Sequence, residues 1–292
     1  MTHDPPLVSI ITPAYNRASF LEETILSVLT QGYPRLEYLV LDDGSTDNTQ
    51  EVLKKYQDRL RWESHDNIGE TCTVNKGFGM VEGEIVCVVN SDDPLLPGAV
   101  SAGVTHLQRH PEALAAYPDW REIGPDSETI KDVRLPQYTL YTMLTGFNVG
   151  MGPGTFISRR AFEVAGVRDT QFRYVGDLEF WFRLATHGQL HHIPEVLATH
   201  RTHPDSASVS ARGAVMAGEL VRMVEKVYRS DNLSAEVRSV RRKVLALAHK
   251  VAVHYCAGCD RAALKHHLHS LWQDPSGFSL SDVSAVVRRL MH

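Results

Sequence analysis

Residues 39–47 read LVLDDGSTD, an apolar run that ends abruptly in a cluster of carboxylates. Residues 85–93 repeat the pattern as IVCVVNSDD. Short, continuous apolar runs rich in β-branched residues are typical of strands that are buried on both faces of a parallel sheet. Ligands of open α/β sheets bind at the carboxyl ends of the strands, so we expect both acidic clusters at one binding edge.

Carboxylates at such an edge repel phosphate groups unless a hard cation lies between them. Oxygen atoms are the ligands that Mg²⁺ and similar divalent cations prefer in proteins. The two clusters therefore predict a divalent metal ion that bridges the protein to a diphosphate, which is the outline of a nucleotide-sugar site.

Five stretches resemble the motifs of one family, and they occur in that family's order. They are VSIITPAYN at residues 8–16, DDGSTD at 42–47, NKG at 75–77, GE at 83–84 followed by NSDD at 90–93, and GDLEFW at 176–181. On these stretches the chain resembles the family 2 glycosyltransferases of the GT-A fold, over residues 7 to about 205. The resemblance implies an α/β domain with a Rossmann-like, mostly parallel sheet flanked by helices. It also implies metal-dependent, inverting transfer of a sugar from a nucleotide diphosphate sugar to a hydroxyl acceptor.

The composition is that of a globular enzyme that does not bind nucleic acid. A chain of 292 residues holds one large domain and an appendage. The net charge of −5 argues against a nucleic-acid-binding surface. Four cysteines without framework spacing fit a reducing compartment. The N-terminus lacks the pattern of a signal peptide, and no apolar stretch reaches the length of a membrane-spanning helix. We therefore expect a cytoplasmic protein.

Strand and helix patterns alternate through the first half of the chain. A strand at residues 8–12 is followed by a helix, for which Ser19 and Glu22 offer a capping box. After the strand at 39–41, Thr46 is the expected N-cap of a helix that reaches residue 60. A short strand at 60–63, a helix at 70–80 and the strand at 85–89 follow. This alternation predicts a parallel sheet built from right-handed crossovers.

The later part of the chain has a different pattern. Residues 122–136 are polar and predict a hairpin or a surface excursion. The glycine-rich residues 150–154 are interpreted either as backbone that a sugar approaches closely or as a tight turn. Beyond a serine-rich stretch at 205–210 the pattern is mostly helical. We expect a GT-A domain at residues 1–205 and a helical C-terminal extension at 206–292.

The resemblance places the nucleotide beside the first two strands. Pro13 and Tyr15 lie where the family holds the base with backbone atoms and an aromatic ring, and a simple turn is the alternative. Asp43 would accept a hydrogen bond from the base, while Asp42 braces the loop. An Asx-turn with helix capping is the structural alternative for Asp43. Ser91 completes the predicted nucleotide-sugar contacts.

Residues 90–92, NSD, stand where the family has Asp-x-Asp, so Asn90 replaces the first acid. The resemblance makes Asp92 the metal ligand, because the last carboxylate of the motif contacts the cation. The replacement lowers the negative charge, so we expect weaker binding of the manganese or magnesium ion. His203, in the stretch THRTHP at 199–204, is expected to complete the coordination shell. The alternative for His203, as for His200, is an ordinary surface or core histidine.

The stretch GDLEFW supplies the expected catalytic base. Inverting transfer needs a group that removes the proton of the acceptor hydroxyl as its oxygen attacks the anomeric carbon. Asp177 matches the family's base position, and its structural alternative is a helix N-cap. Glu179 is the second candidate for the base, although orienting a neighbour or the acceptor is the preferred interpretation for it.

Two groups in the C-terminal part have simpler explanations than binding sites. Cys256 and Cys259, with His266, His267 and His269, are zinc-ligand types, but structural zinc sites usually bring two well-spaced ligand pairs. The surrounding apolar pattern favours the packing of a helical hairpin.

The basic residues of the stretch RSVRRK at 238–243 are most simply a solvated helix face. Peripheral contact with anionic lipid, at the inner face of a membrane, is the alternative for them.

The predicted activity has two rivals. A nucleotidyltransferase would need a glycine-rich, basic loop after its first strand, and residues 13–16, PAYN, lack one. A catalytically silent nucleotide-sugar-binding module would not need the carboxylates of Asp43, Asp92 and Asp177. The expected acceptor is a polysaccharide or lipid-linked glycan of the cell envelope; the sequence does not identify the sugar, the base or the acceptor.

Overall fold

The structure is a computed structural model that describes residues 4–147, 149–203, 213–256 and 260–277. It divides into two compact units whose segments alternate along the chain. The sheet unit comprises the described parts of 4–138, 150–170 and 188–203, and the helical unit comprises those of 139–149, 171–187 and 213–277. The sequence predicts a single boundary at residue 205 instead. The serine-rich stretch 205–210, that boundary and Cys259 lie outside the described residues.

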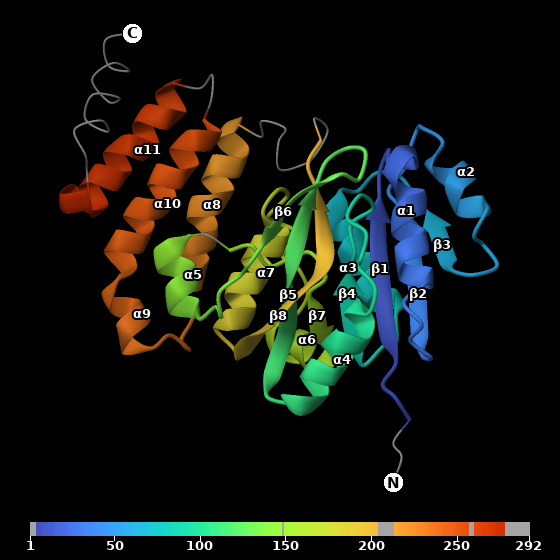
Figure 1. The fold of residues 1–292 in the computed structure, drawn as a ribbon. Coiled ribbons are helices and arrows are strands. Elements are labelled where there is room, and N and C mark those ends of the chain that lie inside the picture. The colour runs from blue at the N-terminus through green and yellow to red at the C-terminus, as the bar shows by residue number, and fades with distance from the viewer. Residues whose placement is uncertain (1–3, 148, 204–212, 257–259, 278–292) are drawn as a thin grey trace. The chain divides into compact units, whose positions relative to one another are not determined.

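The sheet unit contains one eight-stranded sheet (Figure 1). Its main path runs β3-β2-β1-β4-β7-β5-β6, and β8 pairs with β5. The strands are β1 (Val8–Ala14), β2 (Leu36–Asp42), β3 (Arg61–Ser64), β4 (Ile85–Val88), β5 (Ala113–Ile123), β6 (Thr129–Val133), β7 (Phe156–Ser158) and β8 (Gln189–Arg201).

The parallel sheet predicted from the first half of the sequence is confirmed. The strands β1, β2, β3 and β4 pair in parallel. The sheet then becomes mixed, because β7 runs antiparallel to both β4 and β5. β5 is parallel to β8 and forms with β6 the hairpin expected at residues 122–136. β5 therefore runs in the same direction as β4.

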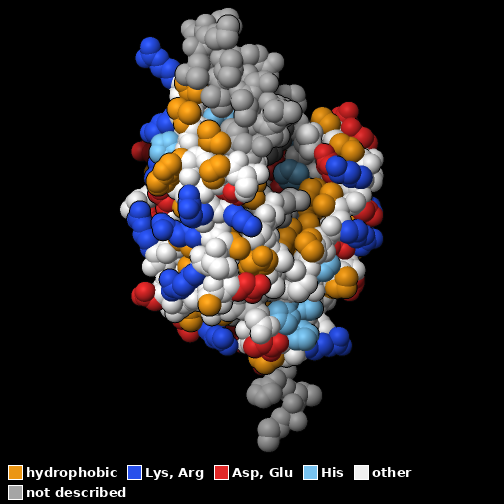
Figure 2. Space-filling view, turned by 90° about the vertical axis from the view of Figure 1, so that its left-hand side faces the viewer, with side chains coloured by type: hydrophobic (Ala, Val, Ile, Leu, Met, Phe, Trp, Pro, Cys, Tyr) orange, Lys and Arg blue, Asp and Glu red, His pale blue; other side chains and the backbone are white. Residues whose placement is uncertain are grey.

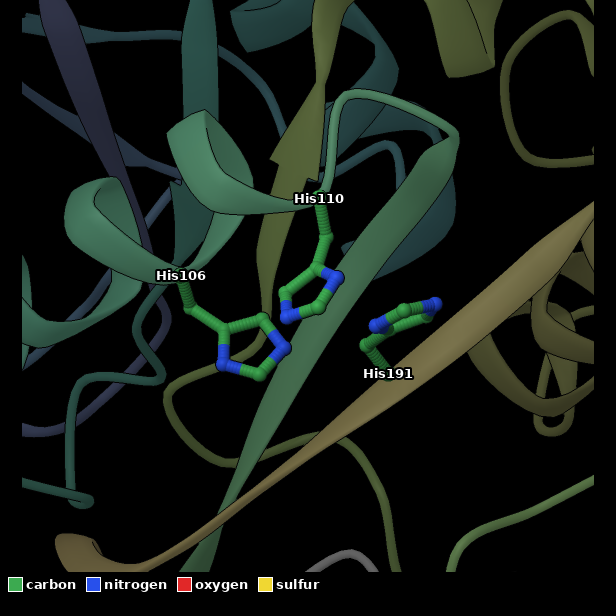
Figure 3. A group of neighbouring side chains, drawn as sticks. All are labelled: His106, His110 and His191. Atoms are coloured by element: carbon green, nitrogen blue, oxygen red, sulfur yellow. The ribbon is translucent and has the colours of Figure 1, made fainter.

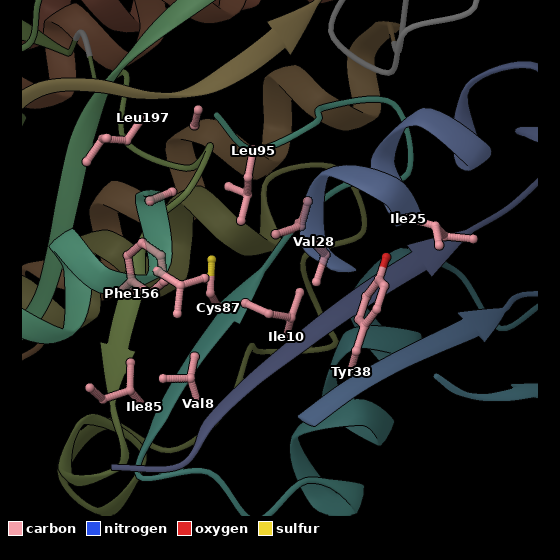
Figure 4. Close-up of a cluster of buried hydrophobic side chains, with 14 of the residues drawn as sticks. Val8, Ile10, Ile25, Val28, Tyr38, Ile85, Cys87, Leu95, Phe156 and Leu197 are labelled. Carbon is pink, nitrogen blue, oxygen red and sulfur yellow. The ribbon is translucent and has the colours of Figure 1, made fainter. Parts of the chain in front are cut away.

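Helices of the sheet unit cover both faces of the parallel strands. They are α1 (Ala18–Leu29), α2 (Thr49–Lys54), α3 (Glu70–Met80), α4 (Ala99–Arg109) and α6 (Arg159–Ala165). Val8 and Ile10 of β1 belong to a core with residues of α1, α2 and α4, part of which Figure 4 shows. Ile11 points to the opposite face and packs with Val74 and Phe78 of α3. The alternation of the side chains of β1 thus buries the strand on both sides.

The helical unit is built around three long helices. Its described elements are α5 (Leu140–Gly146), α7 (Gly176–Ala185), α8 (Gly213–Val227), α9 (Ala235–Ser239), α10 (Arg241–Tyr255), α11 (Asp260–Gln273) and the short 3₁₀ helix η1 (Pro275–Gly277). α10 packs against α8 and α11, which confirms the helical hairpin predicted from the sequence. Among the described residues, the apolar length of every helix is too short to cross a bilayer.

Both predicted helix caps are wrong, because one tertiary contact replaces them. The N-cap of α1 is Arg17, and Ser19 lies inside the helix. The N-cap of α2 is Asn48, beyond Thr46. Asp47 serves both helices: its Oδ2 accepts a hydrogen bond from the amide of Ala18 at 3.1 Å, and its Oδ1 accepts one from the amide of Thr49 at 2.9 Å.

We expect Asp47→Ala to lower the free energy of unfolding by about 1–2 kcal/mol, because it removes hydrogen bonds at the N-termini of two helices. Burial raises the pKa of Asp47, but the hydrogen bonds from Thr49 and Ala18 outweigh it and leave the pKa lowered. The stabilisation is therefore present above the unfolded-state pKa and lost as the pH falls through the folded-state pKa. Urea unfolding at neutral and acid pH measures both effects.

The exposed Asp58 supplies the control for this experiment. Asp58→Ala should change the unfolding free energy by no more than about 0.5 kcal/mol. A loss for Asp47→Ala that persists unchanged at acid pH would contradict the role of its carboxylate.

Candidate active site

The carboxyl ends of β1, β2 and β4 meet at one edge of the sheet, which we call the donor edge. The register pairs Ala14 of β1 with Asp42 of β2, and Ile11 of β1 with Val88 of β4. Pro13 lies buried at the end of β1, and the Tyr15 side chain just beyond it is 46% exposed. An exposed aromatic ring beside polar loops is available to a ligand.

An asparagine in the left-handed backbone conformation joins the first two loops of this edge. Asn16 has a φ of 51°, a conformation that asparagine tolerates better than most residues. Its amide donates to Ser45 Oγ at 2.9 Å, and its Oδ1 accepts from the amide of Thr46 at 2.8 Å. The loop that carries Tyr15 is therefore fixed against the loop that carries Asp43.

Asp43, at the end of β2, braces the loop that leads into α3. Its Oδ1 and Oδ2 accept hydrogen bonds from the amides of Ile68 and Gly69, at 2.7 and 3.0 Å. The bracing expected of Asp42 is also present, because that carboxylate accepts from the amide of Ser45 and from Gln50 and Ser64. A carboxylate offers about four lone-pair positions, so the two bonds of Asp43 leave room for one more donor.

The predicted metal residues lie in contact. Asp92 Oδ2 is 3.1 Å from His203 Nε2 and 3.2 Å from Arg17 Nε. The His203 ring is packed on Phe20, with ring centroids 4.7 Å apart. Adjacent ligands of a six-coordinate cation with bonds of about 2.1 Å lie about 3 Å apart, so the oxygen and nitrogen already have a suitable separation. The donor types also fit manganese, which accepts both carboxylate and imidazole.

Asn90 and Asp93 stabilise this loop by hydrogen bonds to each other and to β8. Asn90 Nδ2 donates to Asp93 Oδ2 at 2.9 Å, and Asp93 Oδ1 accepts from the amide of Arg201 at 2.7 Å. His200 also faces Asp93, and their hydrogen bond raises the pKa of His200. Ser91 is buried, and its carbonyl accepts from Thr24 Oγ1 at 3.1 Å. Of the two histidines in the stretch THRTHP, His203 is therefore the one that meets Asp92.

The side chain of Arg201 is fully buried and holds the Asp92 loop in place. Its Nε donates to the carbonyl of Asp92 at 3.0 Å, and its Nη2 pairs with Glu23 Oε2 at 2.6 Å. Its Nη1 reaches the turn between β5 and β6, through the carbonyl of Gly124 at 3.0 Å.

The helical unit carries the predicted base at the start of α7. Asp177 is exposed in the first turn, and its Oδ1 accepts from the amide of Leu178 at 2.7 Å. The segment before it is anchored by the buried Glu219 of α8. This carboxylate accepts hydrogen bonds from three successive amides, those of Arg173, Tyr174 and Val175, at 3.0, 2.8 and 3.3 Å. The exposed carboxylate of Asp177 is thus carried on a fixed helix start.

Glu179 has a different environment. Its side chain is only 2% exposed and pairs with Arg183 at 2.8 Å and with Lys226 at 2.8 Å. Two cationic side chains therefore contact this carboxylate inside the helical unit. The arrangement favours Asp177 over Glu179 as a proton acceptor for an external substrate.

The glycine-rich segment 150–154 has the geometry of a tight turn. Gly154 has a φ of +64°, and a Cβ atom there would lie 2.8 Å from that of Ala198. The carbonyl of Gly150 accepts a hydrogen bond from Trp120 Nε1, and its amide donates one to Tyr138 Oη. These contacts explain the glycines as turn residues, so a sugar close to the backbone is not needed to explain them.

The sequence analysis assigned no role to three residues of the site, Arg17, Arg201 and Glu219. Arg201 lies inside the stretch THRTHP, and an arginine between two candidate histidines could have been noticed. Arg17 follows the first motif directly. Glu219 carries no local signal, because its partners precede it by more than 40 residues.

The sequence profile of the family described as Glycosyl transferase family 2 matches residues 9–164, more than half of the chain. The chain belongs to glycosyl transferase family 2. An uncharacterised glycosyltransferase of Rickettsia typhi is 27% identical over 207 residues, which cover 68% of this chain and 64% of the relative. The hyaluronan synthase of Pasteurella multocida is 27% identical over 231 residues, which cover 77% of this chain and 23% of the synthase. The chain thus spans less than two thirds of each relative.

Solved structures share the fold. Staphylococcus aureus TarS 1-349 in complex with UDP-GlcNAc aligns with a TM-score of 0.67 and 15% identity, covering 97% of this chain and 79% of that one. The mannosyltransferase PcManGT from Pyrobaculum calidifontis, in complex with GDP-Man and Mn²⁺, aligns with a TM-score of 0.63 and 18% identity, covering 99% and 80%. These likenesses confirm the GT-A-like α/β fold that the sequence predicts.

The two acidic residues of α7 should differ sharply in their effect on stability. We expect Glu179→Gln to lower the free energy of unfolding by about 2 kcal/mol or more, because it leaves Arg183 and Lys226 without their buried anion. Asp177→Asn, the same chemical change at an exposed position, should stay within about 0.5 kcal/mol of the wild type. Urea unfolding monitored by circular dichroism compares them. Equal stability of the two variants would remove the structural role assigned to Glu179.

Proposed function

We propose that this chain transfers a sugar, with inversion, from a nucleotide diphosphate sugar to a hydroxyl acceptor, and that a divalent cation assists. The observation that carries the proposal is the contact between Asp92 and His203 at the donor edge. An acid and an imidazole at metal-ligand separation lie there beside the loops expected to hold a nucleotide. Membership of glycosyl transferase family 2 supports this assignment. UDP-GlcNAc and GDP-Man, the donors named for the two solved relatives, are nucleotide diphosphate sugars.

The nucleotide would lie along the loops that follow β1 and β2. Tyr15 offers an exposed ring and Pro13 a fixed backbone, while Asp43 keeps lone pairs for a donor group of the base. Ser91 would contribute at the adjoining loop after β4. Because Asn16 and Asp42 hold these loops to one another, little ordering of the protein would be needed when the donor binds.

Asp92 and His203 would hold manganese or magnesium, with water and diphosphate oxygens in the other positions. When bound, the ion would offset the negative charge that develops on the departing nucleoside diphosphate. Arg17 already neutralises Asp92 Oδ2. A guanidinium binds phosphate oxygens well. Arg17 is therefore suited to leave Asp92 and to contact the diphosphate when donor and cation bind.

Asp177 would take the proton of the acceptor hydroxyl. Its exposure leaves it accessible to a substrate, and it lies in the first turn of α7. Glu219 acts as a positioning residue, because its three hydrogen bonds fix the backbone that leads into this turn.

The acceptor is proposed to be a growing polysaccharide or a lipid-linked glycan. The relatives named as hyaluronan synthase and chondroitin synthase support the first of these classes. The basic residues at 238–243 favour a solvated face over lipid contact, because Arg238 and Arg242 donate to backbone carbonyls within the unit. On the face shown in Figure 2, basic, acidic and hydrophobic side chains are interspersed.

Asp177→Asn is expected to keep donor binding and to lose transfer by about 100- to 10,000-fold, the usual contribution of a general base. The amide preserves the shape of the side chain but cannot accept the proton. Transfer from a panel of nucleotide sugars, measured with and without manganese, gives the rate, and calorimetry gives the donor affinity.

Asp231→Asn, at an exposed position of the same unit, serves as the matched control and should behave as the wild type. A loss of less than tenfold for Asp177→Asn would place the base elsewhere. Failure of the wild type to transfer or hydrolyse any donor would favour the silent binding module.

The ligand assignment predicts different results for the two metal residues. Asp92→Ala should abolish the dependence of donor binding on the cation, since it removes the carboxylate ligand. His203→Ala should retain binding but lose a preference for manganese over magnesium, because imidazole suits manganese better. Donor titrations with each ion test both. Donor binding by Asp92→Ala that still requires the metal would overturn the site, whereas an unchanged manganese preference in His203→Ala would remove only the histidine.

A further inference from the structure

Three histidines of the sheet unit form a group that the proposed reaction does not use. His106 lies in the last turn of α4, and His110, four residues later, follows the last residue of the helix. Residues four apart share one helix face. His191 of β8 lies beside Ala116 of β5 in the sheet. Figure 3 shows the three rings facing one another, and we call them the histidine cluster.

The spacing of the rings is close to that of a metal site. One ring nitrogen from each histidine lies within 4.8 Å of the other two. The ring centroids of His110 are 4.7 Å from those of His106 and His191. A tetrahedral zinc ion with bonds of about 2.1 Å separates its ligand nitrogens by about 3.4 Å. Small rotations of these half-buried side chains therefore bring the three nitrogens to one ion.

The outward nitrogens of the cluster already have oxygen partners. His110 Nδ1 is 3.2 Å from Glu112 Oε1, and His191 Nε2 is 3.0 Å from Gln189 Oε1. These contacts direct His110 Nε2 and His191 Nδ1 toward the centre of the cluster. Metal-binding histidines commonly bind a carboxylate or carbonyl through their second nitrogen, which fixes the tautomer and the ring orientation.

The third ring supplies a nitrogen that needs a partner. Within the part of the chain that the structure describes, His106 Nε2 is buried and has no hydrogen-bond partner. A buried polar atom without a partner is unfavourable, and a metal ion would satisfy it.

We propose that His106, His110 and His191 bind a zinc ion, with water as the fourth ligand and Glu112 as the carboxylate that orients His110. Three imidazoles suit zinc, whereas magnesium prefers oxygen ligands. The ion fastens the end of α4 to β8, segments that are about 80 residues apart in the chain. Its role is therefore to stabilise the sheet unit.

This zinc site is independent of the proposed function. β5 and β8 run in the same direction as β4, and the cluster lies at their amino ends. It therefore occupies the edge of the sheet opposite Asp92. Loss of the catalytic cation and loss of zinc should have separate consequences.

The test uses the full chain without a histidine tag, freed of metal with a chelator and titrated with zinc chloride by calorimetry. We expect one zinc ion to bind to the wild type with an increase in melting temperature, and the same binding to persist in Asp92→Ala. Cobalt in place of zinc should give the absorption spectrum of tetrahedral coordination.

Variants locate the ion. His106→Gln, His110→Gln and His191→Gln should each weaken zinc binding more than Glu112→Gln, for which a loss of about 10- to 100-fold is typical of a group that orients a ligand. His254→Gln, which changes an exposed histidine of α10, should bind zinc as the wild type does. Donor binding with manganese should be unchanged in all of them.

X-ray absorption of the zinc-loaded wild type identifies the ligands even if a variant does not fold. The proposal predicts three imidazole nitrogens and one oxygen. Absence of tight zinc binding by the wild type, zinc binding lost in Asp92→Ala but kept in the histidine variants, or a shell of carboxylate oxygens would each overturn it.

Discussion

The donor edge depends on the hydrogen bonds of the buried guanidinium of Arg201. A charge without access to water is stable only where every donor finds an acceptor. Arg201 meets this condition by joining the Asp92 carbonyl, Glu23 of α1 and the turn between β5 and β6. These contacts come from parts of the chain that are far apart in sequence. The loop after β4 can therefore keep its shape only when β8 and α1 are both in place, so Asp92 and His203 come together as a consequence of the completed sheet.

Two guanidinium groups lie around Asp92, the acid that remains where the family pattern has two. Arg17 contacts the carboxylate directly, and Arg201 binds the carbonyl of the same residue. With two guanidinium groups so close, a second acid is not required to keep the loop together. Asn90 instead donates to Asp93, which holds the amide of Arg201. Asn90, at the position of the first acid in the family pattern, thus supports the loop, while His203 Nε2 lies 3.1 Å from Asp92 Oδ2.

The sequence predicted those parts of the structure that local patterns determine. The apolar runs before Asp43 and Asn90 identified β2 and β4, and their acidic ends identified the donor edge. Helix caps could not be found in this way, because Asp47 caps α1 across space and no spacing rule connects it to Ala18. The strand β8 was not predicted either, because its pairing with β5 depends on contacts between distant segments. For the same reason the burial of Glu179 against Lys226 could not be derived from the helix that carries it.

The two proposed metal sites differ in the chemistry that would select their ions. At the donor edge one carboxylate and one imidazole leave most of the coordination shell to water and phosphate, an arrangement that favours an exchangeable manganese or magnesium ion. The histidine cluster offers three imidazole nitrogens, while the Glu112 carboxylate contacts the outward nitrogen of His110; three nitrogen ligands favour a retained zinc ion. Their separation to opposite edges of the sheet follows from the parallel direction of β4, β5 and β8. The two proposed sites differ in both ligand type and position. A zinc ion at the histidine cluster could therefore stabilise the sheet without competing for the Asp92 carboxylate at the donor edge.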